Sequence, residues 1–412
     1  MGNVRILHTS DWHLGKNLEG LSRMEEQELF LKDFIEIVEA KQVDLVMIAG
    51  DVYDSPNPPA KAEKMFYDTL KKLSANGERL TLVIAGNHDN PERLVAAGPL
   101  ARDHGIIMVG TPKTIVAQGE YGRHQVIDSG EGFVELEING EKAVILTLPY
   151  PSEKRLNEVL YGAMDEEEER LKIYGDKIKM LLDSLSEKFR EDTINMVVSH
   201  LFAAGSEESG SERSIQLGGS FIVDGSCFPK AAQYIALGHI HKPQIVPGTD
   251  KRARYAGSPI HYSKKEIPFA KKCFIVDLQP QQEFALEEVD FKVYKPIEVW
   301  KCGSIEAALQ KCEENKDREC WVYLEVNTDR YIREDELKLM KSTKQDILEI
   351  VPVLSGKENE EFTLNSFADQ KIEDIFKEFY RKERTVEPQQ EIVELLLSII
   401  QEQEGEESHE TH

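Results

Sequence analysis

Residue types that bind metal ions stand directly after five short apolar runs of this 412-residue chain. They are aspartate, asparagine and histidine: Asp11, His13, Asp51, Asn87, His200, His239 and His241. Carboxylate, amide and imidazole ligands together suit manganese or iron, and zinc and magnesium are also possible. Two such ions about 3.5–4 Å apart can activate a water and hold a phosphate for in-line attack. The chemistry that these residues predict is phosphoester hydrolysis.

The spacing of these residues favours convergence on one site. One residue separates Asp11 from His13, and a pair so spaced points to the same face of an extended segment. His239 and His241 have the same spacing. Asp51 follows a glycine that lets the chain turn sharply at a strand end, so its carboxylate could reach two ions.

His88 and Asp89 are expected to act outside the metal ligands. His88 adjoins the expected ligand Asn87 and cannot easily bind the same ion. Beside a bound phosphate, His88 could stabilise developing charge and protonate the leaving alkoxide, while Asp89 orients its ring. Asp89 could instead be a turn residue. Structural or exposed roles are expected for the other histidines: His8, His104, His124, His261, His409 and His412.

The elements that must position these residues are buried strands. The five runs are short and rich in Val, Ile and Leu, and open α/β sheets gather ligands beyond the carboxyl ends of their strands. Apolar residues at helical spacing predict a helix over 25–40, and a second helix is expected after Pro58 and Pro59. This alternation predicts parallel strands with right-handed crossovers.

Later segments change in character. From about Val116 to Tyr150 the pattern is of strands without helices, with a hairpin turn at Asn139-Gly140, which predicts a second sheet against the first. A long helix is expected over 166–188. Residues 291–354 alternate strand, helix, strand, helix, strand, which indicates a small α+β domain without metal-ligand clusters of its own.

The net charge of −25 is unusual for a protein that holds nucleic acid, because such proteins usually present a basic field. Acidic runs at 165–169 and 402–407 are typical of solvated faces or disordered ends. Basic residues gather at 251–254, 264–265 and 271–272, close in sequence to the last histidine pair. The field could therefore be positive locally.

Five cysteines form no Cys-x-x-Cys pair, which favours reduced structural thiols. They are Cys227, Cys273, Cys302, Cys312 and Cys320. No apolar stretch approaches the length needed to cross a bilayer, and the first expected strand leaves no room for a signal peptide. We expect a cytoplasmic protein without membrane association.

The chemistry-bearing motifs resemble the five motifs of the calcineurin-like metallophosphoesterases. They are Asp11-x-His13, Gly50-Asp51, Gly86-Asn87-His88-Asp89, Ser199-His200 and Gly238-His239-x-His241. Within that superfamily, the segments 6–15 and 49–54 resemble the SbcD family of bacterial, Mre-eleven-like nuclease subunits. The resemblance extends over the whole chain.

The resemblance implies two Mn²⁺ ions, with Mg²⁺ or other divalent ions possible. His88 would take the position of the catalytic histidine. Related archaeal and eukaryotic nucleases often carry a second histidine where this chain has Asp54, so that histidine's role does not transfer. One ion would be bound by Asp11, His13, Asp51 and His241, and the other by Asp51, Asn87, His200 and His239.

The resemblance also implies the fold and its domains. The fold would be α/β, a two-sheet metallophosphoesterase sandwich flanked by helices, with a small α+β capping domain and C-terminal helices. The nuclease domain would span 1–280 and the capping domain 281–360. Helices over 361–403 would bind a partner, and 404–412 would be a disordered acidic tail. The ordinary alternative for the terminal helices is docking on the chain's own body.

The implied activity is that of a DNA nuclease, a double-strand exonuclease and a single-strand or hairpin endonuclease. It would process DNA ends and hairpins in repair, recombination and replication. The partner would be SbcC, an ABC-type ATPase, so ATP would act only through that partner. A homodimer within an assembly of two SbcC and two SbcD chains is expected, and SbcC could supply part of the basic DNA surface.

Two other functions are compatible with the motifs. A small-molecule phosphodiesterase or a protein phosphatase could use the same fold, although the C-terminal third would be unnecessary for it. A non-catalytic scaffold could keep the fold and bind a partner through its helices. Such scaffolds tend to lose metal ligands, whereas every expected ligand position is filled here.

Overall fold

The chain is described by a computed structural model over residues 2–152, 167–212 and 222–354, and at positions 376, 377, 380 and 393. It divides into two compact units. The first contains residues 1–298 and 319–321, and the second contains 299–318 and the residues from 322 onward. The predicted boundary after residue 280 differs from this division. The reason is that strand β18 (Ala285–Asp290) pairs with β17 (Lys272–Leu278) in a sheet of the first unit.

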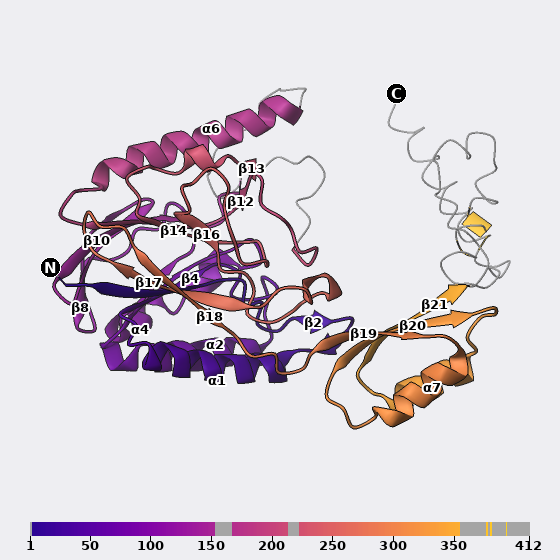
Figure 1. Cartoon of the computed structure of the whole chain (residues 1–412). Coiled ribbons are helices and arrows are strands. Elements are labelled where there is room, and N and C mark those ends of the chain that lie inside the picture. Colours follow the sequence, from indigo (N-terminus) through magenta and orange to yellow (C-terminus); the bar gives the residue numbers. More distant parts are fainter. Residues whose placement is uncertain are drawn as a thin grey trace, which may run out of the picture. The chain divides into compact units, whose positions relative to one another are not determined.

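The first unit contains a six-stranded sheet in the order β18-β17-β1-β4-β5-β6, whose paired strands β17 and β18 are labelled in Figure 1. Strands β1, β4, β5 and β6 are parallel, and β17 is antiparallel to β1. Three of the predicted apolar runs are therefore confirmed as neighbouring parallel strands. The bounds are β1 (Val4–Thr9), β4 (Leu45–Ala49), β5 (Leu80–Ile84) and β6 (Ile106–Val109).

The predicted second sheet is also present, with eight strands in the order β15-β16-β14-β11-β10-β9-β8-β7. The other two apolar runs are its parallel neighbours β11 and β14. The predicted hairpin turn joins β9 to β10, with Asn139 and Gly140 both at positive φ. The bounds are β7 (Gly119–Tyr121), β8 (His124–Gly130), β9 (Phe133–Ile138), β10 (Glu141–Leu148), β11 (Ile194–His200), β14 (Tyr234–Gly238), β15 (Gln244–Ile245) and β16 (Ala253–Tyr255).

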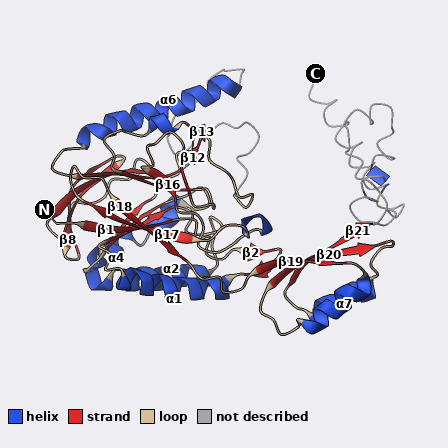
Figure 2. Ribbon diagram, in the orientation of Figure 1, coloured by secondary structure: helices blue, strands red, loops and turns tan. Residues whose placement is uncertain are grey.

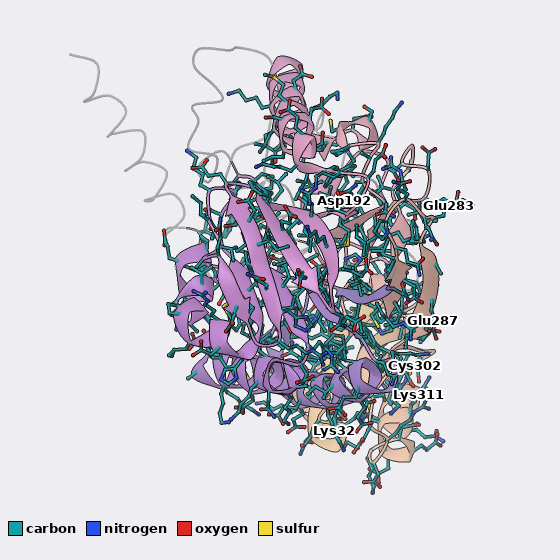
Figure 3. All side chains as sticks on the ribbon, turned by 90° about the vertical axis from the view of Figure 1, so that its left-hand side faces the viewer. Lys32, Asp192, Glu283, Glu287, Cys302 and Lys311 are labelled. Atoms are coloured by element: carbon teal, nitrogen blue, oxygen red, sulfur yellow. The ribbon has the colours of Figure 1, made fainter. Side chains whose placement is uncertain are left out.

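Helices cover the outer faces of the two sheets, so the first unit has four layers (Figure 2). Helices α1 (Met24–Ala40) and α2 (Ala60–Leu73) pack on the six-stranded sheet, and α6 (Glu167–Leu185) packs on the eight-stranded sheet. Seen from the side, strands lie between α6 and the α1–α2 layer (Figure 3). Buried aliphatic side chains from both sheets, such as Ile6 and Val198, form the core between them.

Short elements complete the first unit. They lie in the segments between the longer strands and helices. They are β2 (Asn17–Leu18), β3 (Leu21–Ser22), α3 (Pro91–Val95), α4 (Gly98–Ala101), β12 (Phe202–Ala203) and β13 (Ile222–Val223).

The second unit has the predicted alternation of strands and helices. Its three-stranded sheet has the order β19-β20-β21, with β20 parallel to β21. Ser304 caps the first helix by accepting a hydrogen bond from the Ala307 N–H. The bounds are β19 (Ile297–Cys302), α7 (Ile305–Glu314), β20 (Trp321–Thr328), α8 (Glu334–Thr343) and β21 (Ile347–Leu354).

The predicted C-terminal helices over 361–403 and the tail over 404–412 lie outside the described residues, apart from four single positions that are helical. All five cysteines are buried and form no disulfide, as predicted. Among the described helices, none combines the length and apolar character needed to span a bilayer.

Candidate metal centre

The five strand ends deliver the predicted ligands to one place. β1, β4 and β5 of one sheet lead to Asp11, Asp51 and Asn87, and β11 and β14 of the other lead to His200 and His239. The side chains of Asp11, Asp51 and His200 are fully or almost fully buried. Two sheets therefore contribute candidate ligands to a single buried centre.

Asp11, His13 and His241 form the first cluster of ligand atoms, all within 4.8 Å of one another. The Nε2 atoms of His13 and His241 lie 3.0 Å apart. The Asp11 carboxylate accepts hydrogen bonds from the Ser10 hydroxyl at 2.6 Å and the His239 N–H at 3.0 Å. Two imidazole nitrogens and a carboxylate that converge in this way form a suitable cation site.

Asp51, His200 and His239 form the second cluster. His200 Nε2 lies 3.3 Å from Asp51 Oδ2 and 3.0 Å from Asn87 Oδ1. His239 approaches with its other nitrogen, since its Nδ1 lies 2.9 Å from Asn87 Oδ1. His13 Nε2 lies 3.7 Å from Asp51 Oδ2, so Asp51 stands between the two clusters. The residues present therefore fit two divalent ions with one shared carboxylate.

His88 lies beside both His13 and Asp51. Its ring centroid is 4.6 Å from that of His13, and its backbone N–H donates to Asp51 Oδ1 at 2.9 Å. His88 Nδ1 lies 2.7 Å from the Asp54 carbonyl oxygen. That contact places the proton on Nδ1 and the lone pair on Nε2 in the neutral ring. One ring nitrogen of His88 also lies within 4.8 Å of ligand atoms of His13 and Asp51.

Asp89 does not have the expected geometry for orienting His88. Its buried carboxylate accepts hydrogen bonds from the N–H groups of Val52 at 3.2 Å, Tyr53 at 3.0 Å and Gly86 at 2.8 Å. The Asp54 carbonyl takes the orienting role instead. Asp89 ties the loop after β4 to the loop after β5, which corresponds to the alternative interpretation as a turn residue.

Four candidate ligands have left-handed backbone conformations. Their φ angles are 54° at Asp11, 44° at His13, 51° at Asp51 and 108° at His239. Non-glycine residues adopt positive φ rarely, and such strain is concentrated at functional sites. The surrounding strands must hold these residues in place at a cost in backbone energy.

Two motif glycines allow the sheets to approach each other beside His200. A Cβ at Gly50, where φ is +87°, would lie 2.3 Å from His200 Nδ1. A Cβ at Gly238 would lie 1.9 Å from the Ala49 carbonyl oxygen, which is the hydrogen-bond acceptor of His200 Nδ1 at 2.8 Å. The glycines of the Gly-Asp and Gly-His motifs are therefore required by close packing around His200.

The centre contains groups with strongly shifted pKa values. Burial lowers the pKa of His239 to about 3 and raises the pKa of Asp11 to about 6. Burial also opposes charge on His200, but the Asp51 carboxylate outweighs it and raises the pKa of His200 to about 9. A proton shared between His200 and Asp51 would therefore compete with a metal ion for the same atoms.

Several polar residues beside the centre were not predicted from the sequence. Lys271, expected in a surface basic cluster, is buried and lies 2.5 Å from Glu266. Its neighbour Lys272 is the surface residue, paired with Glu288 at 2.6 Å. Ser211 contacts the ring of His241 at 2.5 Å. No pattern in the sequence distinguishes these residues from ordinary surface residues.

Asp54 has two connections to the centre besides its carbonyl. Its carboxylate pairs with Lys16 Nζ at 2.7 Å and lies 3.6 Å from His13 Nδ1.

His8, expected to be structural, contacts the Tyr234 hydroxyl at 2.9 Å and a backbone carbonyl at 3.1 Å. His124 and His261 likewise contact backbone carbonyl oxygens, each at 3.0 Å.

Known protein families match most of the chain. Residues 4–243 match the calcineurin-like phosphoesterase family, and residues 293–384 match a family described as the type 5 capsule protein repressor C-terminal domain, SbcD_C.

Three relatives are named as the SbcD subunit of the nuclease SbcCD. The Bacillus subtilis protein is 38% identical over 96% of this chain and 97% of its own length. The Rhodobacter capsulatus protein is 34% identical over 67% of this chain and 66% of its own length. The Escherichia coli protein is 29% identical over 96% of this chain and 97% of its own length.

Proposed function

The chain belongs to the calcineurin-like phosphoesterases and, within them, to the SbcD nuclease subunits, and from this premise we propose that it cleaves DNA at a two-metal centre. One observation carries the proposal. Seven candidate ligand side chains from five strand ends converge in two clusters, and Asp51 stands between them. Such a centre is suited to phosphodiester hydrolysis.

We assign one Mn²⁺ to Asp11, His13 and His241 and the other to Asn87, His200 and His239, with Asp51 shared. Carboxylate, amide and imidazole ligands suit manganese or iron, and the resemblance to the SbcD nuclease subunits is the reason for choosing manganese. Bound ions would lower the pKa of a water and neutralise charge on the phosphate.

His88 is the proposed catalytic residue. Its partly buried ring lies against His13, and its Nδ1 is occupied by the Asp54 carbonyl. The other ring nitrogen, Nε2, would have to take up a second proton, and its N–H would then donate to the phosphate or pass that proton to the leaving alkoxide. Asp89 supports this residue from a distance by fixing the two loops, and we infer a positioning role for it.

The partner proposal follows the names of the relatives, which describe a subunit of SbcCD. We infer that SbcC binds the C-terminal region, that two copies of each chain assemble, and that ATP acts only through SbcC. The acidic net charge of −25 fits a subunit whose DNA surface is completed by a partner. From DNA as the proposed substrate, we infer that the protein acts in the cytoplasm.

The activity is tested by digestion of end-labelled linear duplex and hairpin DNA in Mn²⁺, with and without SbcC. We expect shortening of the duplex and opening of the hairpin by the parent chain, and neither by an Asp51→Asn variant. A mononucleotide ester is assayed in parallel. Hydrolysis of the ester with intact DNA would favour the small-molecule phosphodiesterase, and no hydrolysis of either substrate would favour the scaffold.

The partner site is tested by deletion of all residues after Leu364. We expect this variant to keep Mn²⁺-dependent cleavage of simple DNA and to lose co-purification with SbcC. Retained co-purification would contradict the assignment of the partner site to the C-terminal helices.

A further inference from the structure

The metal-ligand candidate His241 is held by side chains at three separate atoms. Its backbone N–H donates to Glu212 Oε1 at 3.0 Å, and its carbonyl oxygen accepts from Lys271 Nζ at 3.0 Å. Its ring Nδ1 lies 2.5 Å from the Ser211 hydroxyl oxygen. The fourth polar atom, Nε2, is the one that faces His13 across the cluster.

Glu266 lies behind this arrangement with no exposed surface. Its Oε1 accepts the hydrogen bond of the Ser211 hydroxyl, and its Oε2 lies 2.5 Å from Lys271 Nζ. The backbone N–H of Tyr262 also donates to Oε2, at 3.1 Å. The carboxylate therefore contacts both of the groups that hold the ring and the carbonyl of His241.

The direction of these hydrogen bonds fixes the tautomer of the ring. A carboxylate only accepts, so Ser211 must donate its hydrogen to Glu266. The Ser211 oxygen is then the acceptor for the His241 Nδ1–H. This order places the proton on Nδ1 and the lone pair on Nε2, which is the form that a metal ion requires.

We propose that Glu266, acting through Ser211 and Lys271, is the positioning residue that sets the orientation and tautomer of His241 for binding one of the two ions. The proposal rests on the two-metal centre proposed above and adds the group that tunes one of its ions. Metal-ligating histidines usually donate their second ring N–H to a carboxylate, a carbonyl or a water. Here a serine stands between the ring and the carboxylate.

The burial of the Glu266–Lys271 pair supports a role beyond stability. Removing two charges from water is expensive, and an apolar pair of similar size is often as stable or more so. Lys271 uses its remaining hydrogens on the His241 carbonyl and on the Ser258 hydroxyl at 2.7 Å. The pair is thus fully engaged in holding a ligand segment and does not merely fill the core.

The test measures binding of Mn²⁺ alone, by isothermal titration calorimetry and by electron paramagnetic resonance of the bound ions. In Glu266→Gln we expect the affinity for one of the two ions to fall about 10- to 100-fold, with the other ion unchanged. Ser211→Ala should weaken binding of the same ion without leaving a buried charge unpaired. Ser211→Thr, which keeps the hydroxyl, should restore the binding. Thermal unfolding checks that each variant is folded.

Glu288→Gln is the matched control, because it breaks the exposed ion pair of the adjacent lysine, Lys272. It should bind two ions as the parent does. If the parent binds two ions and both Glu266→Gln and Ser211→Ala bind them with the parental affinities, this inference is overturned and the proposed function stands. A parent that binds no Mn²⁺ would overturn both.

Discussion

The two halves of the metal centre are built differently. In the half that contains His200 and His239, the second ring nitrogen of His200 is held by a main-chain carbonyl, that of Ala49. In the half that contains Asp11, His13 and His241, the second ring nitrogen of His241 is held by a side chain, that of Ser211. We call these the main-chain-anchored half and the side-chain-anchored half.

This difference determines how each half can change. The position of the Ala49 carbonyl is fixed by β4 and by glycines packed around His200, so substitutions elsewhere cannot remove the anchor. The anchor of His241 depends on Ser211 and Glu266, which are far apart in the chain and can be replaced individually. The side-chain-anchored half is therefore the one whose affinity can be tuned without loss of a ligand.

The largest effect is expected where the two halves meet. Asp51→Asn removes the shared carboxylate, so both ions should be lost. Activity should fall on the order of a thousandfold or more, about 4 kcal/mol of transition-state stabilisation. Calorimetric titration with Mn²⁺ and single-turnover cleavage measure the two losses. A variant that still bound two ions tightly would show that Asp51 is not shared.

His88→Ala should affect catalysis while both halves keep their ions. Loss of a general acid typically costs about 10²- to 10⁴-fold in rate. Mn²⁺ stoichiometry should stay at the parental value, which separates a catalytic residue from a ligand. His104→Ala, at an exposed position, is the matched control. Parental cleavage by the His88 variant would reject its assignment.

The strands of the centre and the convergence of the candidate ligands at their ends could be predicted because their signals are local. Asp51 and His200 each stand at the end of an apolar run, so a strand pattern and a metal-binding residue type are adjacent in the sequence. The anchors of His241 carry no such signal. Ser211 lies in a segment rich in Gly, Ser and Glu, and Lys271 stands in a Lys-Lys pair whose burial only the tertiary fold decides.

Two other predictions differ from the structure for related reasons. From the sequence, the adjacent carboxylate of Asp89 is expected to orient His88. The atom that orients it is the backbone carbonyl oxygen of Asp54. Every residue has such a carbonyl, so residue type does not indicate which one makes this contact. The predicted domain boundary precedes β18, a strand with an exposed, charged sequence. Such a sequence is common at sheet edges, and its pairing with β17 depends on contacts distant in the chain.

Gly238→Ala should disturb the main-chain-anchored half by crowding the Ala49 carbonyl. The added methyl would collide with the Ala49 carbonyl and lie 2.8 Å from His200 Nδ1, so β4 and β14 would have to separate. We expect a loss of about 1–3 kcal/mol in the free energy of unfolding, with weaker binding of the ion at His200. Urea denaturation measures the first and Mn²⁺ titration the second. Gly98→Ala is the control, because its Cβ would meet no atom within 4 Å.

The smallest effect is expected outside both halves, at the Arg5–Asp277 pair. It is bidentate, with 2.8 and 3.0 Å contacts, but its side chains are 36% and 28% exposed. Solvent screening limits such pairs to about 1 kcal/mol or less. Asp277→Asn should therefore lower the free energy of unfolding at pH 7 by no more than this, in contrast to the fully buried pair of Glu266 and Lys271.

The pH dependence of the Arg5–Asp277 pair gives the sign of that small effect. The hydrogen bond from Arg5 lowers the pKa of Asp277, so the folded protein binds the proton less readily than the unfolded chain. The contribution is fully present above the unfolded value of about 3.9 and is lost as the pH falls through the folded pKa. Urea denaturation of parent and variant should therefore converge as the pH is lowered through that range. A difference that grew at low pH would mean that the stabilisation by Asp277 does not come from its ionised form.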